Sequence, residues 1–183
     1  MVTLMQRRRE MMQAGSPGAA APLYPLASGT KTFTGSYKGY VTVTGGNHLS
    51  FGRTGGGGSS KNLKVDISTL TANGASMYDS NWANNTTTIF TVSAGDKVRI
   101  ATKGFVDSAN VKTTTTTIVL YDKNAGANIL SRSITNGTSV EITLSNGGTV
   151  TAIGCNPNIG GNKTDTFTRE FDLEIYINDV RYV

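Results

Sequence analysis

Apolar and polar side chains alternate along most of this chain, with the two-residue period of β-strands. The clearest run lies near the C-terminus, where every second position is occupied by Phe167, Arg169, Phe171, Leu173, Ile175 and Ile177. Successive side chains of a strand point to opposite faces, so this run predicts one long strand with an apolar and a polar face. Similar strand patterns recur upstream, in the segments 41–44, 48–51, 63–67, 89–92, 98–101, 114–120, 139–144 and 149–155.

Glycine- and asparagine-rich segments separate these runs. Asn146-Gly147-Gly148 stands between two of them and predicts a hairpin, because Asn-Gly pairs favour tight β-turns. Gly52 to Lys61 is predicted to be a loop, and 76–88 a longer loop that crosses one end of the domain. The chain is therefore predicted to be an all-β protein, an antiparallel β-sandwich or jelly roll of about nine to eleven strands without an interior helix.

The first 28 residues differ from the rest. Thr3 and Gln6 match a capping box, which predicts a short helix with an apolar stripe and an arginine-rich flank. The stripe consists of Leu4, Met5, Met11 and Met12, and the flank of Arg7, Arg8 and Arg9. The connector that follows, up to Leu26, holds three of the four prolines and is predicted to be extended. We therefore divide the chain into an anchoring segment, 1–28, and a β-sandwich domain, 29–183.

Composition and charge narrow the function. The formal net charge is +5, but the charges nearly balance from Gly15 onward, which argues against a nucleic-acid-binding surface on the folded domain. No apolar run approaches the length of a membrane span, and no secretion signal is recognisable, so synthesis in a cytoplasm is expected. The single cysteine, Cys155, rules out an intrachain disulfide and is expected to be a small buried hydrophobe.

Catalytic and metal-binding motifs are not recognisable. His48 is the only histidine, so a two-histidine metal site is excluded, and we expect no cofactor and no metal. A single Ca²⁺ held by loop carbonyls and one aspartate stays open. Glu170, Asp172 and Glu174 share one face of the C-terminal strand, where they could serve as a glycosidase acid–base pair or form the solvated side of the strand. The solvated side is the better interpretation, and we predict that the chain is not an enzyme.

Aromatic side chains suggest a second kind of site. Tyr78 and Trp82, together with Asn84, lie in the long loop and are candidate glycan contacts, since flat aromatic rings stack on sugar rings. The alternative, which we favour, is that Trp82 closes the open end of the sandwich. Tyr121 and Tyr176 are expected on the outward faces of their strands.

Three short segments carry a resemblance to a known class of proteins. MQRRREMM at 5–12, PLYPL at 22–26 and GTKTF at 29–33 resemble the opening of small structural proteins encoded by phages and prophages of Gram-positive bacteria. The resemblance implies a virion component, in the head, neck or tail, in which an N-terminal arm docks to the particle and a β-domain is displayed.

The side chains of the N-terminal segment could bind RNA, lie on an acidic membrane or dock into another protein. Docking is our prediction, because three arginines are few for the first two and methionine adapts to a protein groove. The Leu/Met stripe would fill a hydrophobic groove of another virion protein, the three arginines would pair with acidic neighbours, and Leu23, Tyr24 and Leu26 would pack along the partner. Many copies per particle, or a homo-oligomer, would give weak contacts with host-surface glycans useful avidity. The alternatives are a free carbohydrate-binding module and, third, a sandwich-fold glycosidase.

Overall fold

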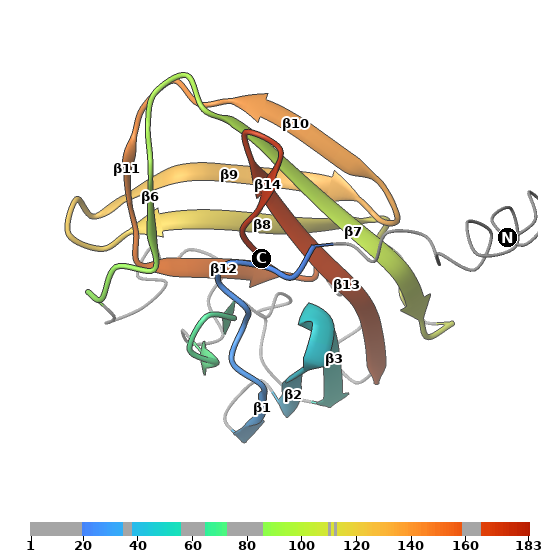
Figure 1. Ribbon diagram of the computed structural model, residues 1–183. Helices are drawn as coiled ribbons and strands as arrows, with labels where there is room; N and C mark the ends of the chain where they lie inside the picture. The colour runs from blue at the N-terminus through green and yellow to red at the C-terminus, as the bar shows by residue number, and fades with distance from the viewer. Residues whose placement is uncertain are drawn as a thin grey trace, which may run out of the picture.

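The structure is a computed structural model that describes residues 20–34, 38–55, 65–72, 86–109, 111, 113–158 and 166–183. These residues form an antiparallel β-sandwich (Figure 1), which confirms the predicted all-β fold. They contain fourteen strands and one short 3-10 helix, Gly45–Asn47. Eleven of the fourteen strands are three residues or longer, at the upper end of the predicted range. The predicted N-terminal helix lies outside the described residues.

One sheet has seven strands in the order β1, β2, β3, β13, β7, β10, with β14 paired to β13. The bounds are β1 (Gly29–Thr34), β2 (Lys38–Thr44), β3 (His48–Gly55), β7 (Lys97–Asp107), β10 (Ser139–Thr143), β13 (Phe167–Ile177) and β14 (Val180–Arg181). The predicted C-terminal strand, β13, lies in the middle of this sheet and pairs with β3 on one side and β7 on the other. Its central position explains why its apolar face is the longest in the sequence.

The second sheet has five strands in the order β5, β4, β12, β8, β9, and a two-stranded sheet joins β11 to β6. The bounds are β4 (Val65–Asp66), β5 (Thr71–Ala72), β6 (Phe90–Val92), β8 (Thr115–Asp122), β9 (Ala127–Thr135), β11 (Gly148–Val150) and β12 (Ala152–Asn156). In Figure 1, β7 and β13 cross over β8 and β9, so the two larger sheets form the layers of the sandwich. None of the described residues belongs to a helix long and apolar enough to span a membrane.

The core lies between the sheets and consists of the apolar residues that alternate along their strands. Phe171 of β13 is at its centre, with its ring stacked on Phe51 at 5.9 Å and on Phe105 at 4.8 Å between ring centroids. Burying a side chain of this size contributes about 1.5–3 kcal/mol to folding. Cys155 is fully buried in the same core, as predicted.

A bulge in β7 keeps Phe105 on the core side. The register between β13 and β7 shifts between Glu170 and Asp172, and Gly104 has a φ of 62° at that place. The extra residue reverses the alternation of β7, so Phe105 points inward although Lys103, two positions earlier, points outward. Glycine adopts this backbone conformation more readily than residues with a side chain.

Three expectations from the sequence are wrong in detail. The predicted hairpin at Asn146-Gly147-Gly148 does not form, because β10 pairs with β7 while β11, beyond the turn, pairs with β6. Leu144, which follows β10, continues the pairing with the β7 segment through backbone hydrogen bonds with Gly95 and Asp96. The chain then passes from this sheet to the one that contains β11.

The other two differences concern Gly52 and Tyr121. Gly52 to Gly55 belong to β3 instead of a loop, and the ring of Tyr40 lies so close to Gly52 that a Cβ there would be 2.1 Å from its Cε1 atom. Tyr121 is 3% exposed, because it packs with Val119 and Ala152 on the second face of β8 and not against solvent. A strand that is buried on both faces has no outward register.

Candidate functional site

Two groups of predicted site residues lie outside the part of the chain that the structure describes. They are the docking residues Leu4, Met5, Arg7, Arg8, Arg9, Met11 and Met12, and the candidate glycan contacts Tyr78, Trp82 and Asn84. Their roles stay predictions. The described part contains the other predicted docking residues, Leu23, Tyr24 and Leu26, and the three carboxylates of β13.

The arm, residues 20–28, lies against the domain beside β14. The backbone amides of Leu23 and Tyr24 donate hydrogen bonds to the carbonyls of Arg181 and Tyr182, at 3.2 and 2.8 Å. The amide of Leu26 donates to the side-chain oxygen of the buried Asn47 at 3.0 Å. Pro25 has no amide hydrogen. Each of the other three backbone amides from residue 23 to residue 26 therefore has an acceptor in the domain.

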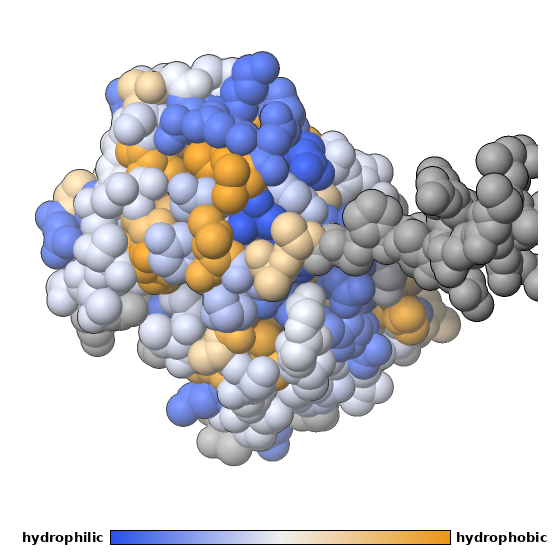
Figure 2. Space-filling view, in the orientation of Figure 1, coloured by the Kyte–Doolittle hydropathy of each residue, from blue (hydrophilic) through white to orange (hydrophobic). Residues whose placement is uncertain are grey.

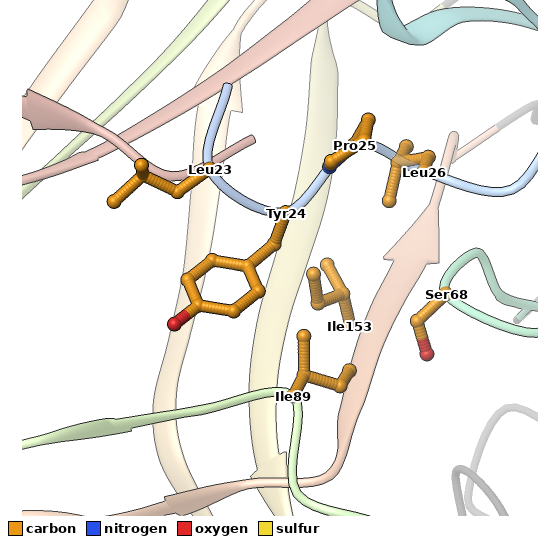
Figure 3. Close-up of a pocket in the computed structure, with 7 residues that line it drawn as sticks. All are labelled: Leu23, Tyr24, Pro25, Leu26, Ser68, Ile89 and Ile153. Atoms are coloured by element: carbon orange, nitrogen blue, oxygen red, sulfur yellow. The ribbon is translucent and has the colours of Figure 1, made fainter. Parts of the chain in front are cut away.

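Aromatic packing holds the arm as well. The ring of Tyr24 contacts those of Phe90 and Tyr182, at 5.4 and 5.5 Å between centroids, and Phe90 contacts Tyr182 at 5.1 Å. Beneath the arm is a cavity of about 300 Å³. Figure 3 shows its lining, with the arm residues on one side and Ser68, Ile89 and Ile153 on the other.

A buried carboxylate supports the turn on one side of this cavity. Burial raises the pKa of Asp66, and hydrogen bonds from the hydroxyls of Ser68 and Thr69 and the amide of Ser68 partly oppose that rise. These bonds close the turn that follows β4. We therefore assign Asp66 a structural role, because the carboxylate is engaged by its own turn.

The burial of Leu26 corrects one of the predicted docking residues. Leu26 is 8% exposed and belongs to the core, so it fixes the arm to its own domain and does not reach a partner. The sequence did not reveal this, because the residues that cover Leu26 come from distant segments. Leu23 and Tyr24 remain accessible, at 58% and 37% exposure.

Leu23 and Tyr24 are joined by a third exposed apolar side chain. Val180 of β14 is 49% exposed, and it precedes Arg181, to which Leu23 is hydrogen-bonded. We call Leu23, Tyr24 and Val180 the edge patch. Figure 2 shows hydrophobic residues gathered on this side of the molecule, in the region of β6 and the C-terminus. Apolar side chains gathered in this way are typical of contact surfaces.

The outward face of the seven-stranded sheet carries the second group of candidate residues. Ser50 donates to Glu170 at 3.0 Å, and His48 is hydrogen-bonded through Nδ1 to Asp172 at 2.8 Å. These are cross-strand pairs of β3 and β13. The predicted solvated side of β13 is therefore one row of a polar surface that continues onto β3.

Glu174 occupies the next position of that row and is nearly buried. Its carboxylate accepts hydrogen bonds from Lys103 Nζ at 2.7 Å and from the Tyr176 hydroxyl at 3.0 Å. Burial alone would raise the pKa of Glu174, but these bonds and the charges of Lys103 and Arg181 hold it below its usual value. The guanidinium of Arg99 lies over the Tyr176 ring, 3.8 Å from the centroid, which completes a chain of contacts across β7 and β13.

These contacts bear on the glycosidase hypothesis. Each of the three carboxylates is bonded to a neighbouring side chain of the sheet. Such cross-strand pairs are typical of the solvated face of an antiparallel sheet and need no catalytic role to explain them. Among the described residues, no group of three or more His, Cys, Asp and Glu side chains is placed to hold a metal ion. The face offers charged and hydroxyl groups for binding, and its basic members on β7 were not singled out from the sequence.

Arg169 was placed correctly on the apolar side of β13, and the structure explains how a charge is accommodated there. The side chain is fully buried and pairs with Asp107 at 2.8 Å. Its remaining donors reach the backbone carbonyls of Thr113, before β8, of Thr115, the first residue of β8, and of Pro157, after β12. This group holds the sheets together and is not accessible to a ligand.

No known protein family, curated protein or solved structure was found to match this chain.

Proposed function

We propose that this chain is a structural component of a virion, of the kind encoded by phages and prophages of Gram-positive bacteria. It docks through its N-terminal segment and displays the β-sandwich. The resemblance of the segments 5–12, 22–26 and 29–33 to the opening of such proteins supports this proposal. So does the composition of residues 1–14, whose apolar and arginine side chains suit a protein groove better than they suit solvent.

The observation that carries the proposal is the way the arm is attached. Leu26 and Tyr24 pack against the domain, and three backbone amides are bonded to it, so the point from which the N-terminal segment leaves is fixed. A fixed exit point gives a tethered domain a defined position on its partner. The edge patch lies at the same place, so a surface that binds residues 1–19 would also cover Leu23 and Val180.

The alternative function is a free carbohydrate-binding module that uses Tyr78, Trp82 and Asn84. Nothing in the described residues favours it over docking, and the two functions are compatible if the displayed domain binds host glycans. A catalytic function is a weaker candidate, because structural contacts engage each carboxylate of β13.

The test is incorporation into particles. In a host that carries the gene, we expect mass spectrometry of purified particles to find the full chain in many copies. A variant lacking residues 1–19 should stay in the soluble fraction, with a circular dichroism spectrum and thermal unfolding like those of the full chain. Leu23→Asp should reduce incorporation, and Lys31→Asp, an exposed substitution outside the edge patch, should not.

Three outcomes would refute the proposal. They are the absence of the chain from particles, unchanged incorporation without residues 1–19, and equal effects of Leu23→Asp and Lys31→Asp. Glycan-array binding that is lost in Trp82→Ala, in a chain absent from particles, would establish the binding module instead.

A further inference from the structure

A hollow on the outward face of the seven-stranded sheet has the properties of a ligand site. It lies between β7 and β10, has a volume of about 310 Å³ and is open to solvent. We call it the β7–β10 pocket; it is lined by Arg99, Ala101, Thr102, Lys103, Gly137, Thr138 and Ser139. Its size is at the lower end of the range for small-molecule sites, about 300–1,000 Å³, and fits one sugar-sized group.

The hollow exists because the side chain in its middle is small. Ala101 lies between Arg99 and Lys103 on the outward face, and its register partners are Glu174 on β13 and Ser139 on β10. A methyl group fills little of the space between two long basic side chains. A larger residue at position 101 would occupy the pocket without removing any charge.

Arg99 is arranged as a donor that is ready for a ligand. Its guanidinium carbon lies over the Tyr176 ring, 3.8 Å from the centroid, and this contact restricts where the group can lie. Among the described residues it has no hydrogen-bond acceptor. Stacking uses the face of the guanidinium and leaves the N–H groups at its edge, and these match the two oxygens of a carboxylate or phosphate.

Among the charged groups near the pocket, Arg99 is the one whose charge no neighbouring carboxylate balances. Glu174 is neutralised by Lys103 at 2.7 Å and also lies near Arg181. Glu141 is the register partner of Arg99 on β10, and within the described part of the chain no ion pair joins the two. Lys103 has further ammonium hydrogens beyond the one directed at Glu174. An anion in the pocket would therefore meet the uncompensated charge of Arg99 and the remaining hydrogen-bond donors of Lys103.

Hydroxyl groups line the other side of the pocket. Ser139 is exposed, and its hydroxyl has no hydrogen-bond partner among the described residues. The turn beside it is held in shape, because the Thr138 amide and hydroxyl both donate to the Thr135 carbonyl and the Thr138 carbonyl accepts from Thr102. A rigid turn that presents a free hydroxyl suits a ligand that carries hydroxyl groups as well as a charge.

From this arrangement we propose that the β7–β10 pocket binds a small polyhydroxylated anion, that is, a sugar or polyol that carries a carboxylate or phosphate. Arg99 and Lys103 hold the anionic group, Ser139 contacts a ligand hydroxyl, and Ala101 provides the floor. The site is distinct from the edge patch and does not depend on the docking role. On a displayed domain it would recognise acidic glycans or polyol phosphates of a surface.

Titrations of the full chain, followed by amide chemical shifts in NMR spectra, test this. The probes are glucuronate and glycerol 3-phosphate, with glucose, glycerol and inorganic phosphate for comparison. We expect glucuronate or glycerol 3-phosphate to shift the amides of β7 and of residues 137–139. The neutral compounds should give no saturating shifts, and inorganic phosphate should bind more weakly than glycerol 3-phosphate.

Variants assign the binding to the pocket. Arg99→Gln should weaken binding about tenfold or more, since it removes charge-assisted hydrogen bonds. Arg132→Gln, which removes an exposed arginine of β9 in the other sheet, should have no effect. Ala101→Leu should abolish binding by filling the pocket, and Glu141→Gln should strengthen it about twofold by removing a nearby negative charge.

Four results would overturn the proposal. They are no saturable shifts with either anion, equal binding of the neutral compounds, binding of inorganic phosphate as tight as that of glycerol 3-phosphate, and equal losses in Arg99→Gln and Arg132→Gln. The two anionic probes also separate the sources of the anion, because a carboxylated sugar and a polyol phosphate are tested independently. Amide spectra of each variant show whether the fold is retained, so a loss of binding through misfolding is recognised.

Discussion

Replacing Arg169 with methionine measures how much stability one buried guanidinium gives the sandwich. Arg169 is on the inner face of β13, where Nε and Nη2 donate to the Asp107 carboxylate at 2.8 and 2.9 Å. The guanidinium also donates to the carbonyls of Thr113, Thr115 and Pro157, at 2.6, 2.9 and 2.5 Å. Because β13 is in one sheet and the segments bearing these carbonyls are joined to strands of the other, the side chain fastens the two layers at one end.

The expected magnitude follows from what methionine leaves behind. Methionine keeps much of the apolar volume, but three carbonyl oxygens and Asp107 lose the guanidinium as a donor. A buried polar group left without a partner costs about 1–3 kcal/mol, and breaking a buried ion pair from one side costs about 3–5 kcal/mol. The Asp107 side chain is 28% exposed, so water can replace part of the hydrogen bonding that it loses with the guanidinium. We expect Arg169→Met to lower the free energy of unfolding by about 3–5 kcal/mol.

Urea unfolding followed by far-UV circular dichroism measures this change. With a denaturant dependence of about 2 kcal/mol per molar urea, the midpoint should fall by about 1.5–2.5 M. Arg132→Met removes an exposed arginine and should change the free energy of unfolding by less than about 0.5 kcal/mol. Asp107→Asn should lie between the two, because Arg169 keeps its three carbonyls. A loss below about 1 kcal/mol in Arg169→Met would refute the view that the guanidinium fastens the sheets.

Three further predictions concern packing, acid sensitivity and thiol reactivity. Gly52→Ala should destabilise the domain because the added Cβ meets the Tyr40 ring. Tyr40→Ala should relieve part of that loss, with a coupling energy of about 0.5–3 kcal/mol in a double-mutant cycle measured by urea unfolding. Additive losses of stability in the two variants would contradict the contact. Backbone amides of the next turn and of β11 lower the pKa of Asp122, so its contribution is present above about pH 4 and is lost as the pH falls. Asp122→Asn should therefore cost about 1–2 kcal/mol at pH 7 and progressively less in more acidic melts, and a loss independent of pH would be inconsistent with this. Burial raises the pKa of the Cys155 thiol well above its usual value, so a thiol reagent should label it only at the rate of unfolding; rapid labelling of the native chain would show that the core opens locally.

The sequence predicts the fold class and the central strand, because both depend on local alternation. Phe167 to Ile177 form one strand as predicted, and Arg169 falls on its inner face. Strand partners are a different matter. The segments around Asn146-Gly147 have the composition of a hairpin, yet they separate into two sheets, since pairing is decided by which distant strand buries each face.

The candidate sites were predicted less well, for a related reason. The sequence analysis places Leu26 against a partner as part of an extended arm, whereas in the fold its amide bonds to Asn47 and its side chain packs in the core. Arg99 and Lys103 gained significance only when the fold placed Ser139 of β10 beside the pocket and the Tyr176 ring of β13 beneath Arg99. Alternation around Arg99 predicts an outward position, but it says nothing about a hollow between β7 and β10.

The bonds between the arm and β14 impose an order of events during biosynthesis. Leu23 and Tyr24 leave the ribosome early, but the carbonyls that receive their amides belong to Arg181 and Tyr182, near the other end of the sequence. A nascent chain that stops before β14 has no acceptors for these bonds and lacks the Tyr182 ring that supports Tyr24. A chain shorter than this would therefore lack the contacts that hold the arm, which can form only after residues 181 and 182 have been made.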